Sequence, residues 1–151
     1  GLAQIWITGG EHIVQGVVKL NDTYFNTKKY NTVAWRNLVS CQEVGHTLGL
    51  DHQDENFNNT PLGSCMDYSS DPTPNQHPNA HDYAQLEAIY AHLDSSTTLS
   101  QSGNSGSGAD VPDDPSAWGK SKRHDGHGRN SLFERDLGNG NKLFTFVFWA
   151  E

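Results

Sequence analysis

The chain has 151 residues, of which 34% are hydrophobic, and a formal net charge of -8 at pH 7, a size that fits one small domain with appendages. Its acidic balance argues against nucleic acid as a partner, because phosphate binding needs clustered Lys and Arg, and we interpret the one short basic cluster, Lys120, Lys122 and Arg123, as a solvated loop. A mean hydropathy of -0.70, with no apolar run near the roughly 18 residues of a spanning helix, excludes a membrane span.

Two strands are predicted at the start of the chain, over residues 2–8 and 13–20. Both runs are rich in the β-branched and aromatic side chains that fit a pleated sheet. Gly9-Gly10 between them is a turn signal. A polar loop is expected after the second strand.

A helix is predicted over residues 32–48. Asn31 or Thr32 can cap its N-terminus, and Gly49 is expected to end it, since glycine adopts the positive φ of a sharp C-terminal turn. The side chains that repeat at helical spacing on one side are Trp35, Leu38, Val39 and Gln42.

Residues 51–79 are polar, rich in Asn and Pro, and without a regular pattern. A stretch of this length usually carries a function or is anchored to the rest of the fold. A second helix is predicted over residues 80–93, capped by Asn79. Its expected buried stripe consists of Tyr83, Leu86, Ile89, Tyr90 and Leu93.

The C-terminal part of the chain has a different composition. Residues 95–115 are rich in Ser, Gly, Asp and Pro and are interpreted as a flexible linker. Two apolar runs around Gly138–Asn141 predict a β-hairpin within residues 131–150, which we expect to dock on the same chain. The chain therefore divides into a domain of residues 1–94, the linker, and a hairpin segment of residues 116–151.

The segment most informative about function runs from Gln42 to His52. On a helix, Gln42 and His46 lie one turn apart on the same face, so both side chains can reach one ion. Glu43 can hold a water beside that ion, and the bend at Gly49 can return His52 as a third ligand. Imidazole suits Zn²⁺, and three protein ligands leave a fourth position for water, as in catalytic zinc sites.

This segment resembles the signature of the metzincin zinc peptidases, the clan of the matrixins and astacins, H-E-x-x-H-x-x-G-x-x-H, in which three histidines bind zinc and the glutamate is the general base. Glu43, His46, Gly49 and His52 match at the right spacing, and Gln42 stands in place of the first His. The amide oxygen of Gln42 can coordinate zinc, as a weaker donor than imidazole. The alternatives are a two-histidine site completed by water or another histidine, and a degenerate site without metal. The other histidines considered are His12, His77, His81 and His92.

The resemblance also implies a Met-containing turn beneath the zinc. Met66, the only Met in the chain, sits where such a turn is expected. Tyr68 is similar in position to a Tyr of astacin-like enzymes that reaches the developing oxyanion; a structural Tyr is the alternative. Cys41 and Cys65 immediately precede the first ligand position and Met66. If the turn lies under the helix as in the family, they form a disulfide worth about 3 kcal/mol; two free thiols are the alternative.

The resemblance implies an α+β fold with a short sheet, an active-site helix, the Met-turn and a C-terminal helix, its N-terminal part abbreviated or missing. It implies a secreted zinc endopeptidase that uses Glu43 as general base and pairs its protein or peptide substrate with the edge strand 13–20. We expect a monomer. The rival is a catalytically weakened or inactive binding module of the same fold. Ca²⁺ is a second candidate cofactor, because oxygen ligands gather at Asp51, Asp54 and Glu55, although a solvated acidic loop explains them as well.

Overall fold

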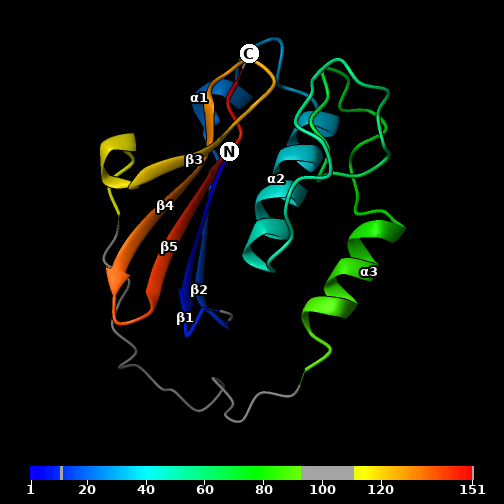
Figure 1. Ribbon diagram of the computed structural model, residues 1–151. Coiled ribbons are helices and arrows are strands. Elements are labelled where there is room, and N and C mark those ends of the chain that lie inside the picture. Colours follow the sequence, from blue (N-terminus) through cyan, green and yellow to red (C-terminus); the bar gives the residue numbers. More distant parts are fainter. Residues whose placement is uncertain (11, 93–110, 151) are drawn as a thin grey trace.

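The computed structural model describes residues 1–10, 12–92 and 111–150. A five-stranded antiparallel sheet lies against helix α2 (Val33–Thr47), and α3 (Ala80–Ile89) lies on the other side of that helix (Figure 1). The fold is therefore α+β, as predicted. Within the described ranges, none of the helices has the length and apolar character that a membrane crossing requires.

Both ends of the chain contribute to the one sheet. Its strand order is β2-β1-β5-β4-β3. The N-terminal hairpin and the C-terminal hairpin meet along β1 and β5, so the predicted C-terminal hairpin docks on the same chain and shares a sheet with the predicted domain of residues 1–94. The strands are β1 (Leu2–Thr8), β2 (His12–Lys19), β3 (Lys120–His124), β4 (Asn130–Gly138) and β5 (Asn141–Val147).

The two faces of the sheet are covered by different layers, because alternate side chains of a strand point to opposite faces. Ala3 and Ile5 of β1 pack with Phe146 of β5 on the face toward α2. Leu2 and Trp6 belong to a second apolar cluster on the opposite face. The tight turn between β1 and β2 is made by Gly9 and Gly10, both at positive φ.

Most of the predicted linker lies outside the described residues. Of its described residues, Val111 is buried in the cluster on the sheet face away from α2, whereas residues 112–115 are exposed. The short 3₁₀ helix η2 (Pro115–Ala117) then leads to Trp118, which contacts Phe133 edge-to-face. A further short helix, α1 (Asp22–Phe25), occupies part of the expected polar loop after β2.

Helix α2 is the element that positions the candidate site. Thr32 caps it by accepting a hydrogen bond from the N–H of Trp35 at 3.2 Å. The helix ends at Thr47, and Gly49 follows with a φ of +92°, the left-handed region that glycine tolerates. The predicted helix and its glycine stop are therefore confirmed.

Helix α3 is shorter and more exposed than predicted. It begins with a capping box between Asn79 and Asp82 and ends at Ile89, before the predicted end at residue 93. The predicted buried stripe is wrong, since only Leu86 of its described members is partly buried. α3 is fixed through the buried carboxylate of Asp82 rather than through an apolar face. The exposed members are Tyr83, Ile89 and Tyr90, and Leu93 lies outside the described residues.

Candidate metal site

Helix α2 and the bend after it bring His46 and His52 together. His46 lies in the last turn of the helix, and the reversal at Gly49 turns His52 back toward it. The two Nε2 atoms are 2.8 Å apart and the rings meet edge-on. His46 is 1% exposed and the side chain of His52 is 2% exposed. Two of the predicted ligands therefore converge in a buried place.

Hydrogen bonds orient both rings in the same way. Nδ1 of His46 lies 2.9 Å from the carbonyl oxygen of Leu50, and Nδ1 of His52 lies 2.5 Å from Oε1 of Glu55. Carbonyl and carboxylate oxygens accept, so each Nδ1 donates and carries the proton of its ring. The Nε2 atoms then meet lone pair to lone pair. This contact requires a positive charge between them, either a second proton on one ring or a cation.

Burial decides whether the ring of His46 can carry a second proton. Desolvation, together with the neighbouring charge of His52, holds the pKa of His46 well below its ordinary value. His46 is therefore a neutral imidazole at pH 7, which is the form that binds metals.

Gln42 and Glu43 are buried in the same part of α2. Gln42 is 0% exposed and lies one turn before His46; Glu43 is 1% exposed. Neither the amide atoms of Gln42 nor the carboxylate oxygens of Glu43 form a hydrogen bond with any described residue. An unsatisfied buried amide costs about 1–3 kcal/mol, and a charged group costs more. The fold keeps both groups in spite of this cost.

Burial also changes the acidity of Glu43. Desolvation raises the pKa of its carboxyl group to about 7, and the nearby amino group of Gly1 opposes the rise. That amino group lies 3.8 Å from Oε1, beyond hydrogen-bond distance. Glu43 therefore exchanges its proton close to neutral pH.

The donor set fits a zinc ion. Two imidazole nitrogens and an amide oxygen, with one position left open, are ligands that zinc accepts. Nitrogens bound at about 2.0–2.1 Å to one tetrahedral zinc lie roughly 3.3 Å apart, so the rings of His46 and His52 need to separate by only about half an ångström. Among the described residues, no group of three or more His, Cys, Asp or Glu could hold a metal. None of the other histidines considered therefore completes the site, and Gln42, buried one turn before His46, stays the predicted third ligand.

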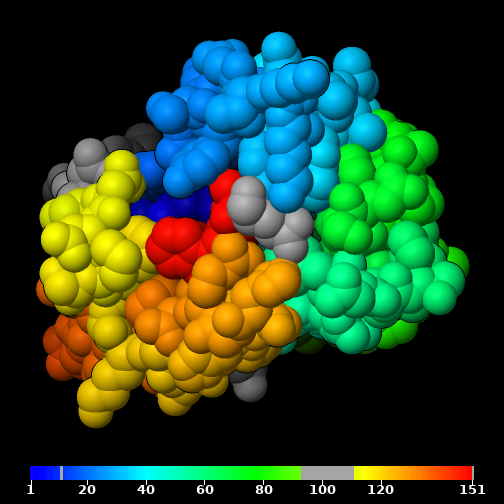
Figure 2. Space-filling model, turned by 90° about the horizontal axis from the view of Figure 1, so that it is seen from above, coloured from blue at the N-terminus to red at the C-terminus, as the bar shows by residue number. Residues whose placement is uncertain are grey.

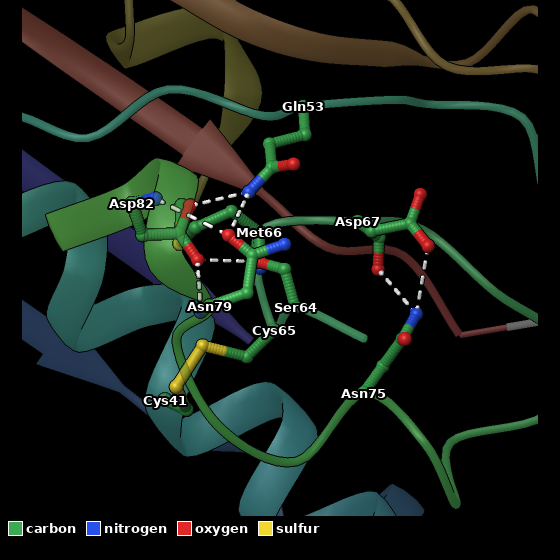
Figure 3. The surroundings of a disulfide bond; sticks show 9 residues. All are labelled: Cys41, Gln53, Ser64, Cys65, Met66, Asp67, Asn75, Asn79 and Asp82. Carbon is green, nitrogen blue, oxygen red and sulfur yellow. Dashed lines mark hydrogen bonds between the residues drawn. A yellow bond between two sulfur atoms is a disulfide. The ribbon is translucent and has the colours of Figure 1, made fainter. Parts of the chain in front are cut away.

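A disulfide connects α2 to the turn that carries Met66. Cys41 and Cys65 are joined with their Cα atoms 5.9 Å apart, as predicted (Figure 3). Met66 is fully buried, and a Cβ built on Gly45 would lie 2.5 Å from its sulfur. The turn therefore packs directly against the helix, one residue before His46.

A buried carboxylate anchors this turn to α3. Asp82 accepts hydrogen bonds from Ser64 Oγ at 2.5 Å, from Gln53 Nε2 at 2.6 Å and from the N–H of Asn79 at 2.8 Å (Figure 3). Ser64 in turn accepts the N–H of Met66 at 2.9 Å. The long segment 51–79 is thus anchored by polar contacts, which agrees with the expectation for a stretch of its length.

Strand β5 covers the histidines. Phe146 stacks on the ring of His46, with centroids 4.1 Å apart and planes 12° apart. Tyr68 contacts the ring of His52 and donates its hydroxyl to the carbonyl of Val147 at 3.3 Å. Burial raises the pKa of Tyr68 well above its ordinary value, so the phenol stays protonated. Its role at the oxyanion stays a prediction.

The candidate site is closed off from the surface in this conformation. Two pockets of the described part of the molecule, with volumes of about 300 and 480 Å³, are lined by other residues than His46, His52, Gln42 and Glu43. In the view of Figure 2, the red end of the chain sits among the blue N-terminal segments and the yellow and orange C-terminal region. A polypeptide has no direct path to the histidines.

Comparison with models of protein families, with curated proteins and with solved structures found no match to this chain.

Two residues that support His52, Glu55 and Arg123, were not predicted from the sequence to do so. Glu55 was assigned to an acidic loop and Arg123 to a solvated basic cluster. Arg123 instead lies in β3 and forms ion pairs with Asp51 at 2.6 Å and with Glu55 at 3.1 Å. The interpretation of Arg123 as part of a solvated loop is therefore wrong. Its two partners lie far away in the sequence, so no local pattern indicates them. Asp51 and Glu55 both pair with this guanidinium, and the Ca²⁺ site stays a prediction.

Proposed function

We propose that the chain is a secreted zinc endopeptidase of the metzincin type. The observation that carries the proposal is the meeting of two buried Nε2 atoms, of His46 and His52, at 2.8 Å, with each Nδ1 held by an acceptor. Buried imidazoles held through their second nitrogen are typical of metal ligands. The disulfide supports a secreted protein, since such bonds persist in oxidising compartments.

The ligands of the proposed site are His46, His52 and Gln42. Zinc bound there would polarise a peptide carbonyl and lower the pKa of a bound water to about 7. The carbonyl of Leu50 and the carboxylate of Glu55 orient the two imidazoles through their Nδ1 atoms, which leaves the Nε2 atoms toward the proposed ion. The amide of Gln42 has no described protein partner that competes for its oxygen, so the oxygen is available as the third donor.

Glu43 is the proposed general base. It takes a proton from water at its carboxylate and returns it to the nitrogen of the leaving amine, a role that typically contributes 10²–10⁴-fold to the rate. Neither of its oxygens is held by a hydrogen bond to a described residue. A carboxylate without such partners can hold and release the proton.

The proposed substrate is an extended polypeptide. β2 is an edge strand of the sheet and offers its backbone groups to a further strand, a mode of binding with little demand on side chains. Because β5 closes the histidines off, hydrolysis requires that β5 and α2 move apart. Access to Glu43 depends on the same movement.

A second candidate is a non-catalytic module that holds its metal permanently. The observation that favours it is the burial of Gln42, Glu43 and His46, each at most 1% exposed. A closed metal site of this kind would stabilise the fold rather than turn over a substrate.

Replacement of Glu43 by Gln tests the two candidates. If the chain is an endopeptidase, the wild type binds one zinc per chain and cleaves casein. Glu43→Gln then still binds zinc, but its cleavage rate is at least about 100-fold lower. A non-catalytic module binds zinc without cleavage in either form. Wild-type protein that binds no zinc when supplied in excess contradicts both candidates.

A further inference from the structure

An arginine from β3 bridges two carboxylates on the outer side of His52. Arg123 donates from Nη1 and Nη2 to the two carboxylate oxygens of Asp51, at 2.7 and 2.6 Å. Its Nη1 also donates to Oε1 of Glu55 at 3.1 Å. Planar two-point binding of this kind fixes orientation as well as charge.

Glu55 transmits this constraint to the imidazole. The oxygen that Arg123 contacts also accepts the Nδ1–H of His52 at 2.5 Å. The second oxygen of Glu55 accepts the hydroxyl of Ser131 at 3.3 Å, and its main-chain carbonyl accepts the N–H of Gly126 at 2.9 Å. Both the side chain and the backbone of Glu55 are therefore held by the C-terminal strands and the loop between them.

We propose that Glu55, held by Arg123 and Ser131, is the positioning residue that presents His52 to the metal ion. The inference rests on the proposed zinc site and deepens it. An ionised carboxylate only accepts hydrogen bonds, so Nδ1 of His52 carries the proton and Nε2 keeps its lone pair. The negative charge also makes Nε2 a stronger donor to a metal.

The residues that hold Glu55 come from a part of the chain outside the metzincin-like region. Arg123 is separated from Asp51 by 72 positions, and Ser131 from Glu55 by 76. The C-terminal strands therefore do more than extend the sheet. They set the orientation of a ligand that lies in the segment after α2.

Arg123→Met in the full chain tests the proposal, with Lys122→Met as the matched control. Lys122 precedes Arg123 in β3. Its half-exposed side chain pairs with Glu134 at 3.3 Å, and Glu134 is not one of the residues that hold Glu55. Zinc affinity is measured by competition with a chromophoric chelator. Arg123→Met weakens it about 10–100-fold, the usual effect of losing an outer partner of a ligand, whereas Lys122→Met changes it less than about twofold.

A second readout does not need metal. The ¹⁵N chemical shifts of the His52 ring in metal-free protein report which nitrogen carries the proton, and Arg123→Met reduces the Nδ1–H form while Lys122→Met leaves it unchanged. Glu55→Gln, whose amide oxygen still accepts from His52, loses less zinc affinity than Glu55→Ala. Thermal unfolding confirms that each variant is folded.

The outcomes separate this inference from the proposed function. Tight zinc binding by wild type, with equal affinity in Arg123→Met and Glu55→Ala, overturns the inference and leaves the zinc site standing. Equal losses in Arg123→Met and Lys122→Met also overturn it, because the effect is then not specific to the path through Glu55. Wild type that binds no zinc overturns both.

Discussion

A Cβ atom added to Gly45 would lie 2.5 Å from the sulfur of Met66. Met66 is fully buried, and a pocket of about 300 Å³ is lined by both Gly45 and Met66. The neighbouring disulfide between Cys41 and Cys65 holds the same two segments together. A side chain larger than hydrogen at position 45 therefore requires the thioether of Met66 to shift.

Gly45→Ala tests this contact. Alanine gains about 1 kcal/mol over glycine in helix propensity, whereas displacing the buried side chain of Met66 from its packed position costs about 1–3 kcal/mol. We expect a net loss of stability, on the order of 1 kcal/mol, in denaturant unfolding. Val44→Ala, at the adjacent half-exposed position, is the control and changes stability little. An increase in stability for Gly45→Ala would show that Met66 moves freely.

Gln42→Leu separates the cost of the buried amide from its use as a ligand. The amide of Gln42 has no described hydrogen-bond partner, so its removal stabilises the metal-free protein by about 1–3 kcal/mol. The same change weakens zinc binding at least about tenfold, because one donor is lost. Gln42→His, with a third imidazole, strengthens zinc binding. Unchanged zinc affinity in both variants would exclude Gln42 from the ligand set.

Phe146→Ala tests the cover over the site. Phe146 stacks on His46 from β5, so its truncation opens a path and speeds the removal of zinc by a chelator. Phe133→Ala is the matched control, since Phe133 is equally buried in β4 but belongs to the cluster on the opposite face of the sheet. Both variants lose about 3–5 kcal/mol of stability. Equal chelation rates in the two would show that β5 does not control access.

The local elements of the fold could be predicted from the sequence. β1, α2 and the hairpin β4–β5 lie close to their predicted ranges. Each depends on neighbours within a few residues, through alternation, helical period and glycine turns. Gly49, whose positive φ was predicted, belongs to the same class.

Contacts between distant residues could not be predicted. Arg123 is a basic side chain in a polar stretch, and the sequence alone predicts that it is solvated. Only the folded sheet brings it beside its partner, Asp51. The stacking of Phe146 on His46 depends in the same way on the pairing of β5 with β1. α3 shows the converse case, because helical spacing predicts an apolar stripe but does not say whether another element covers it.

The most direct test of the account is X-ray absorption at the zinc edge of the zinc-loaded protein, for wild type and His52→Ala. The account predicts a shell of mixed nitrogen and oxygen donors with two imidazoles in wild type, and one imidazole in the variant. A wild-type spectrum with fewer than two imidazoles, or one that His52→Ala leaves unchanged, would contradict it.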